Sequence, residues 1–331
     1  MKEESKMAVI NLLEAINEAL DLKLADDQRV VVFGEDVGFE GGVFRVTAGL
    51  QKKYGEDRVF DTPIAEAAIV GGAMGMALNG LIPIAEIQFD GFIFPGLAEL
   101  VSHIARYRNR TRGAYSVPLV IRIPVGGGIK ALEHHSESLE SLLGQIPGIK
   151  VVTPSTPYDA KGLLISAIED PDPVVFLEPK RIYRAGKQEV PSEMYRIPLG
   201  KAKVLQEGKD ITVVAWGAMV RETEKAIKML ENEGVSVELI DLRSISPIDT
   251  ETIINSVKKT GRFLVVSEAV KTYGASAELI ALVNEKAFLH LESPSARVTG
   301  HDITVPLARG EHFHFVSPER IKKAILESIK F

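Results

Sequence analysis

The sequence of 331 residues contains no cysteine. Disulfide bonds, thiolate-bound zinc, a cysteine nucleophile and an iron–sulfur cluster held by this chain are therefore excluded. The lack of cysteine fits a reducing compartment, and the first residues, Met1 to Lys6, are polar and acidic. We expect neither a signal peptide nor a transit peptide, and a cytoplasmic location.

Excess positive charge is also missing, because the formal net charge is −6. We therefore expect no nucleic acid partner. The basic run Arg106 to Arg112 follows an apolar helical pattern, where cations complement the helix dipole, so we interpret it as structural. The uncharged run Ala67 to Ala85 contains glycines, an asparagine and Pro83, which argues against a membrane span. Its first part, Ala67 to Asn79, is predicted to be a buried helix of small residues.

Short β-branched runs alternate with helical patterns along the whole chain, which indicates parallel α/β sheets. A polar, proline-bearing stretch separates two such series, and the length suits two domains. We predict a first domain at residues 7–185, a linker at 186–204 and a second domain at 205–331. The predicted strands are Arg29–Phe33, Leu81–Ile87, Pro118–Ile123, Ile149–Thr153, Val174–Leu177, Ile211–Ala215, Ser236–Ile240 and Phe263–Val266. The predicted helices besides Ala67–Asn79 are Met7–Leu24, Val220–Glu233, Asp249–Lys259 and Ser276–Ala287.

Polar side chains follow the predicted strands of the first half, and open α/β sheets bind ligands at the carboxyl ends of their strands. Glu35, Gln88 and the pair His134 and His135 lie at such ends. Glu66 begins the helix that follows DTPIA. As a helix-capping carboxylate it would gain only about 0.3–1 kcal/mol from the helix dipole. Apolar surroundings would raise its pKa and suit a proton-sharing role, so both interpretations stay open on the residues alone.

Other motifs also have two interpretations. The histidine pair suits acid–base chemistry or a structural role. His312 and His314 alternate as on a strand and could bind a metal, although no second ligand cluster accompanies them. Asp170 and Asp172 are hard oxygen ligands for a cation, or solvated turn carboxylates.

The glycine-rich segment GGGIKA, Gly126 to Ala131, follows a predicted strand and satisfies a relaxed dinucleotide-binding template. A true dinucleotide unit would place an acid at the end of the next strand, whereas Thr153-Pro154-Ser155 follows there. We therefore do not expect a nicotinamide cofactor.

Seven segments together resemble the beta subunit of a 2-oxo acid dehydrogenase decarboxylase component, of the pyruvate or branched-chain type, from about Met7 to Phe331. They are FGEDVGFEGGVFR (Phe33–Arg45), DTPIAE (Asp61–Glu66), AEIQF (Ala85–Phe89), HSES (His135–Ser138), PGIKVVTPSTPYDAKGLL (Pro147–Leu164), GKDITVVAWGAMV (Gly208–Val220) and RVTGHD (Arg297–Asp302). The resemblance implies a pyrimidine-binding domain followed by a transketolase-type C-terminal domain.

The resemblance also implies roles for particular residues. Glu66 corresponds to the glutamate that hydrogen-bonds the aminopyrimidine ring of thiamine diphosphate. Ile64, Gln88 and Phe92 match positions that contact this ring, and Glu35 matches an acid near it. His135 corresponds to the histidine that assists transfer of the acyl unit to a lipoyl group, whereas His134 has no assigned counterpart.

Family members further hold a structural potassium ion, for which the matching positions are Leu119, Ala167, Ile168, Asp170 and Asp172. The family's diphosphate-binding and magnesium-binding pattern, a GDG segment followed by asparagines, is absent from this chain. An alpha subunit is therefore the implied partner, in a two-alpha, two-beta assembly that acylates a separate lipoyl acyltransferase component.

The substrate stays open, because pyruvate, branched-chain 2-oxo acids and acetoin share this scaffold. AEIQF followed by Phe92, and LEPKRIYR (Leu177–Arg184), slightly favour branched-chain acids. A ferredoxin-dependent oxidoreductase is disfavoured by the lack of cysteine. A non-catalytic subunit that only stabilises its partner is disfavoured by the presence of Glu66 and His135.

Overall fold

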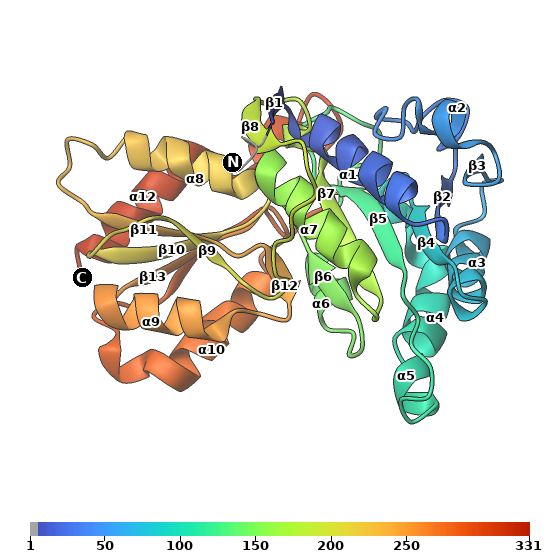
Figure 1. The fold of residues 1–331 in the computed structure, drawn as a ribbon. Coiled ribbons are helices and arrows are strands. Elements are labelled where there is room, and N and C mark those ends of the chain that lie inside the picture. Colours follow the sequence, from blue (N-terminus) through green and yellow to red (C-terminus); the bar gives the residue numbers. More distant parts are fainter. Residues whose placement is uncertain (1–5) are drawn as a thin grey trace, which may run out of the picture.

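The computed structural model describes residues 6–331, so Met1–Ser5 of the predicted polar start lie outside the described part. Two helix-covered sheets lie side by side (Figure 1). The first half of the chain has helices at Leu12–Asp26 (α1), Leu50–Tyr54 (α2), Glu66–Leu78 (α3), Leu97–Glu99 (α4), Tyr107–Arg110 (α5), Glu140–Gly144 (α6) and Pro157–Glu169 (α7). The second half has helices at Ala218–Lys228 (α8), Thr250–Thr260 (α9), Ala275–Ala287 (α10), Glu311–His314 (α11) and Pro318–Ile329 (α12). Short 3₁₀-helices occur at Asp90–Phe92 (η1), Phe94–Gly96 (η2), Lys180–Ile182 (η4) and Phe288–His290 (η5), and a π-helical turn occurs at Leu100–Ile104 (η3). None of the helices within residues 6–331 has the length and apolar character needed to span a membrane.

Within residues 6–331, the larger sheet has seven strands in the order β12-β6-β7-β5-β4-β2-β3. They are Val30–Gly34 (β2), Val59–Asp61 (β3), Ile82–Glu86 (β4), Val120–Val125 (β5), Lys150–Val152 (β6), Val174–Pro179 (β7) and Ser244–Ser246 (β12). Neighbouring strands are parallel except β12, which runs antiparallel to β6. This edge strand comes from the second half of the chain and was not predicted, because Ser244–Ser246 has no apolar alternation of its own.

The smaller sheet has the order β14-β13-β10-β11-β9 within the described residues. Its strands are Lys203–Gln206 (β9), Ile211–Ala215 (β10), Val237–Asp241 (β11), Phe263–Val266 (β13) and Ala296–Val298 (β14). In Figure 1, α8 and α12 cover one face of this sheet, and α9 and α10 cover the other. Strands buried on both faces read as continuous apolar runs, so β10 and β13 coincide with the predicted strands. The predicted α/β class is confirmed.

The N-terminal pattern was predicted as one helix from Met7 to Leu24, and this was wrong. Met7–Ile10 is a strand (β1) that pairs antiparallel with Gln188–Pro191 (β8). The helix begins only at Leu12, because the Asn11 side chain accepts a hydrogen bond from the Glu14 backbone N–H at 2.9 Å. The Glu14 side chain in turn accepts a hydrogen bond from the Asn11 backbone N–H at 2.8 Å, which completes a capping box. The predicted linker at residues 186–204 thus contains β8 and the first residues of β9.

The small-residue helix α3 was predicted to be buried, and only part of it is. Ile69, Val70, Ala73 and Ala77 pack into the core, whereas the opposite face is exposed. That exposed face is formed by Ala67, Ala68, Gly75 and Leu78. An apolar helix with an uncovered apolar face is typical of a surface that another chain covers.

A buried charge cluster joins three strands of the larger sheet. Arg122 on β5 donates to Glu178 on β7 at 2.7 and 2.9 Å, and to Glu86 on β4 at 2.6 Å. The Tyr183 hydroxyl donates to Glu178 at 2.6 Å. Arg122 is completely buried, and burial raises the pKa of Glu86 above its ordinary value. The cluster holds β4, β5 and β7 together on the face of the sheet that α1 and α7 cover.

Replacing Arg122 should be strongly destabilising, because Arg122→Met leaves two buried carboxylates without their cation. We expect a loss of about 3–5 kcal/mol in the free energy of unfolding, measured by urea denaturation. Arg29→Met is the matched control, because Arg29 is exposed and pairs with Asp27 on the surface. The control should lose much less, because solvent screens an exposed ion pair. Equal effects of the two substitutions would contradict this account of the cluster.

Candidate active site

The candidate residues follow four neighbouring strands at one edge of the larger sheet. Glu66 follows β3, Glu35 follows β2, Gln88 follows β4 and His135 lies on the segment after β5. These strands are adjacent in the order β5-β4-β2-β3 and run parallel, so their carboxyl ends meet at one edge. The topology therefore gathers these predicted site residues at the position where open α/β sheets bind ligands.

The loop that carries Glu35 is tied to the segment that precedes Glu66. Asp61 accepts hydrogen bonds from the backbone N–H groups of Gly38, at 2.6 Å, and Phe39, at 3.1 Å. The Thr62 N–H donates to the carbonyl of Gly34 at 3.0 Å. Asp61, the first residue of DTPIAE, thus holds the loop that follows Glu35 beside the segment that leads to α3.

Glu35 and Glu66 influence each other electrostatically at this edge. Glu35 is buried, and burial is the largest cause that raises the pKa of its carboxyl group. The negative charges of Glu66 and then Asp36 raise the pKa of Glu35 further, while the Ala65 N–H lowers it. Among the described residues, Glu35 Oε1 is a buried oxygen without a hydrogen-bond partner. An unpaired buried carboxyl oxygen suits a polar ligand, and the aminopyrimidine ring expected from the resemblance fits this requirement.

Ile64 and Gln88 lie on the accessible side of the same edge. Ile64 precedes Glu66 by two residues and is 84% exposed. Gln88 donates from Nε2 to Asp36 at 3.1 Å, which holds its amide beside the Glu35 loop. Together with the exposed apolar face of α3, Ile64 forms an uncovered apolar surface beside buried Glu35.

Three rings surround the expected reaction zone. The ring centroid of His135 lies 4.4 Å from that of Phe89 and 4.9 Å from that of Phe92. Phe89 and Phe92 also contact each other edge to face, at 5.6 Å. Phe92 lies on η1, directly after β4, so this turn brings the predicted pyrimidine contact and the predicted acyl-transfer histidine together. His134 packs instead beside Phe94, at 6.0 Å.

The hydrogen bond of His135 fixes which ring nitrogen carries a proton. Nδ1 lies 2.7 Å from the carbonyl oxygen of Glu133. A carbonyl oxygen only accepts hydrogen bonds, so Nδ1 must donate and keeps its proton. Nε2 is then the nitrogen that can gain or lose a proton at the site.

The residues of the predicted potassium site are already partly engaged. Asp170 accepts from Lys150 Nζ at 2.6 Å, and Asp172 accepts from Arg108 Nε at 2.5 Å. A cation there would rely on backbone carbonyl oxygens of Leu119, Ala167 and Ile168 rather than on unpaired carboxylates. Arg108 belongs to the basic run Arg106 to Arg112, which supports the structural interpretation of that run.

The prediction of alternating histidines on a strand was wrong. Glu311–His314 is a single helical turn, so His312 is exposed while His314 is buried. Residues two apart on a helical turn face different directions, which separates the two imidazoles. No group of three His, Cys, Asp or Glu side chains within residues 6–331 is arranged to hold a metal ion.

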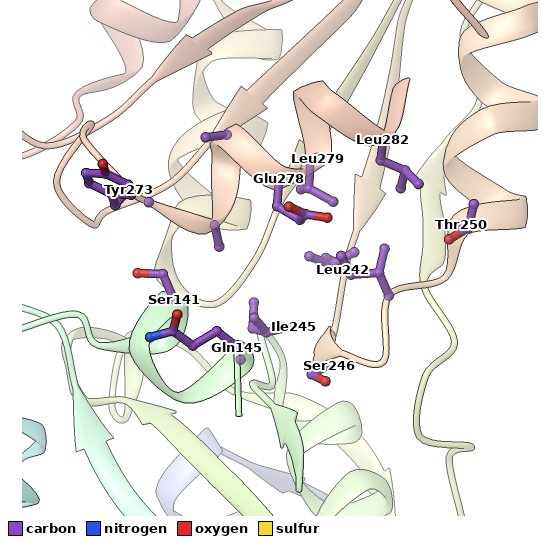
Figure 2. Close-up of a pocket in the computed structure, with 15 residues that line it drawn as sticks. Ser141, Gln145, Leu242, Ile245, Ser246, Thr250, Tyr273, Glu278, Leu279 and Leu282 are labelled. Carbon is purple, nitrogen blue, oxygen red and sulfur yellow. The ribbon is translucent and has the colours of Figure 1, made fainter. Parts of the chain in front are cut away.

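A cavity of about 580 Å³ lies between α6 and α10, away from these strand ends. Figure 2 shows Ser141 and Gln145 of α6 across this cavity from Glu278 and Leu279 of α10. None of the predicted site residues lines it. The candidate active site is therefore the open strand-end edge and not this cavity.

The comparisons with known proteins identify the class first. Residues 8–186 match the family described as the transketolase pyrimidine-binding domain, and residues 200–321 match the transketolase C-terminal domain. A solved structure titled "Split gene transketolase, inactive beta4 tetramer" matches with a TM-score of 0.80 and 24% identity, over 98% of this chain and 99% of that chain. The chain is thus a two-domain protein with the transketolase-type fold.

Curated relatives narrow the class to one family. The pyruvate dehydrogenase E1 component subunit beta of Acholeplasma laidlawii is 73% identical over 98% of this chain and 99% of its own length. The corresponding subunits of Mycoplasma pneumoniae and Bacillus subtilis are 54% and 53% identical, over 98% and 92% of this chain and 100% and 94% of their own lengths. The chain belongs to the family of pyruvate dehydrogenase E1 component beta subunits.

The electrostatic coupling at the site predicts a pH effect. Because the Glu66 charge raises the pKa of Glu35, Glu66→Gln should move the Glu35 titration to lower pH. In the unchanged chain, folded Glu35 holds its proton more tightly than the unfolded chain does, so its contribution to stability falls as pH rises. Carbon-13 NMR titration of labelled glutamate carboxyl groups measures the shift. An unchanged or higher Glu35 pKa in the variant would show that the two carboxyl groups do not interact.

Proposed function

We propose that this chain is the beta subunit of a pyruvate dehydrogenase, which decarboxylates pyruvate with thiamine diphosphate and transfers the acyl unit to lipoyl groups of an acyltransferase component. The observation that carries the proposal is the placement of Glu66 at the start of α3, beside buried Glu35 and at the same strand-end edge as the Phe92–His135 contact. The names of the curated relatives support pyruvate as the substrate.

The residues of this edge would hold the aminopyrimidine half of the cofactor. Bound thiamine diphosphate supplies an electron sink for carbon dioxide loss. Glu66 would share a proton with a ring nitrogen, and the raised pKa of Glu35 helps to keep that end of the site protonated. Ile64 and Phe92 offer an apolar and an aromatic face to the ring, and Gln88 offers an amide.

His135 would act on the second half of the reaction. Its Nδ1–H is fixed by the Glu133 carbonyl, so Nε2 is the atom that can deliver a proton to a sulfur of the lipoyl ring when the acyl unit is transferred. The flanking rings of Phe89 and Phe92 restrict the imidazole plane. Correct orientation of the proton-donating group can supply a large part of the lowering of the activation barrier for such a step.

A second subunit is part of the proposal. The chain lacks the family's pattern for holding the diphosphate and magnesium, and Ile64 and one apolar face of α3 are uncovered. An alpha subunit that covers these surfaces would complete the site in a two-alpha, two-beta assembly. A cytoplasmic location and a potassium ion near Leu119 and Asp170 remain part of the proposal.

Pyruvate replaces the branched-chain preference expected from the sequence, because the curated relatives favour the pyruvate alternative. The segment LEPKRIYR, which was expected to favour branched-chain acids, packs in the larger sheet. Glu178 and Tyr183 belong to the buried Arg122 cluster, and Lys180 is buried as well. These contacts give the segment a structural role in the sheet.

The decisive substitution is Glu66→Gln in the complex with the alpha subunit. Removal of one acid–base group should lower pyruvate decarboxylation by about 10²- to 10⁴-fold, measured with an artificial electron acceptor. The assembly should survive, because Glu66 is only half-buried. Exposed Glu56→Gln is the matched control and should keep normal turnover. Normal decarboxylation by Glu66→Gln would rule out the catalytic assignment, and loss of assembly would instead indicate a purely structural helix cap.

A further inference from the structure

Gly126 and Gly127 lie directly against the second half of the chain, and Gly128 lies against Arg181 of the first half. A β-carbon on Gly126 would lie 2.9 Å from Glu268, and one on Gly127 would lie 2.5 Å from the ring of Phe315. A β-carbon on Gly128 would meet Arg181 at 2.7 Å, and the φ of Gly128 is +94°. The positive φ of Gly126 and Gly128 favours glycine, and the contacts of Gly126 and Gly127 place the GGG motif between the two halves of the chain.

Two carboxylates hold the backbone of the same segment. Glu268 accepts a hydrogen bond from the Gly127 N–H at 2.9 Å. Glu311 accepts from the Gly128 N–H at 2.8 Å and from the Lys130 N–H at 3.1 Å. Both acids belong to the second half; Glu311 is buried, being 5% exposed, and Glu268 is half-buried. Charged acceptors make such bonds stronger than neutral ones.

The segment held in this way, residues 127–130, is the part of the loop that precedes His135. The Gly126 N–H donates to the carbonyl of Glu137 at 2.7 Å, which closes residues 126–137 into a loop. Glu311 anchors Lys130, five residues before His135 in the sequence. The loop also abuts the η1 turn, where a β-carbon on Gly91 would lie 2.3 Å from the His134 carbonyl oxygen. The imidazole thus lies on a loop that is closed by the Gly126–Glu137 hydrogen bond and is held at residues 127–130 by the two acids.

Positive charge partly compensates these acids. Lys180 is buried among the carboxylates of Asp90, Glu268, Glu137 and Glu311, and burial lowers the pKa of its ammonium group. Its Nζ also lies 5.7 Å from the ring centroid of Phe89, the ring that packs on His135. The guanidinium of Arg181 lies 5.2 Å from the ring of Phe315. Burial raises the pKa of Glu268, and the positive charges of Arg181 and Lys180 offset part of this effect.

We propose that Glu311, assisted by Glu268, is the positioning residue for His135: the second half of the chain sets the orientation of the loop that presents the acyl-transfer histidine. The inference rests on the proposed function of His135. It concerns residues that do not touch substrate or cofactor and act through the backbone of residues 127–130.

Glu311→Gln tests the proposal in the complex with the alpha subunit. A glutamine keeps one carbonyl oxygen but places an N–H₂ donor against one of the two backbone donors. We expect reductive acylation of a lipoyl domain to fall by about 10- to 100-fold, the range for a misplaced catalytic group. Decarboxylation with an artificial acceptor should stay within about twofold of the unchanged complex, since that assay bypasses the lipoyl group. His135→Ala serves as the reference, because it shows how far reductive acylation and decarboxylation diverge when the imidazole itself is lost. Glu224→Gln, at an exposed position, is the matched control.

Hydrogen exchange supplies a readout that does not depend on activity. Amides of residues 127–135 should exchange faster in Glu311→Gln, while those of β10 and β13 should not change. If that variant does not assemble, Glu311→Asp keeps the charge and shortens the reach, and the same pattern is expected with a smaller effect.

Equal slowing of both assays, no slowing of either, or unchanged exchange at 127–135 would overturn the positioning role. Failure of the proposed function is distinguishable, because the unchanged complex would then not decarboxylate pyruvate while the exchange result would still report on the loop.

Discussion

The Arg122 guanidinium is the contact on which the arrangement of the candidate site depends. It joins β4, β5 and β7 through two buried carboxylates, and each of these strands leads into a segment of the site. β4 leads to Gln88 and the Phe89 and Phe92 rings, β5 leads to the His135 loop, and β7 leads to Lys180 and Arg181. A buried ion pair with several hydrogen bonds fixes relative strand positions, so these three segments start from one shared anchor.

The site has two distinct parts that the chain supports in different ways. The acid pair Glu35 and Glu66 is held within the first half, by Asp61 and the start of α3. The histidine is held from outside, by acids of the second half against a glycine-rich backbone. The first part is open to solvent around Ile64, which fits the proposal that another subunit completes the site. Under the proposed function, the two halves of the chain support the two chemical steps in different ways.

Much of this could be predicted from the sequence. Continuous apolar runs identified the buried strands. The bounds of β10 and β13 were predicted to the residue, because a strand that is buried on both faces reads as a nearly continuous apolar run. The strand-end rule brought Glu35, Glu66, Gln88 and His135 to one edge, and the quoted motifs led to the family. The start of α1 was missed because the Asn11 cap was overlooked, and the exposed face of α3 was missed because composition alone cannot say which apolar faces another chain covers.

The contacts between segments that are distant in the chain could not be predicted from the sequence. Nothing local links Glu311 to Gly128, since these residues are far apart in the chain and meet only when the second half packs on the first. The GGG run did carry a signal, close backbone approach, but the partner in that approach was unknown. β12 was missed for the same reason, because Ser244–Ser246 becomes a strand only by pairing with β6.

Steady-state kinetics of the two-subunit complex and of each subunit alone test the central claim most directly, with pyruvate, a branched-chain 2-oxo acid and acetoin as substrates. The account predicts thiamine-dependent turnover only when both subunits are present, with the highest kcat/KM for pyruvate. Turnover by this chain alone, or a clear preference for the branched-chain acid, would contradict it.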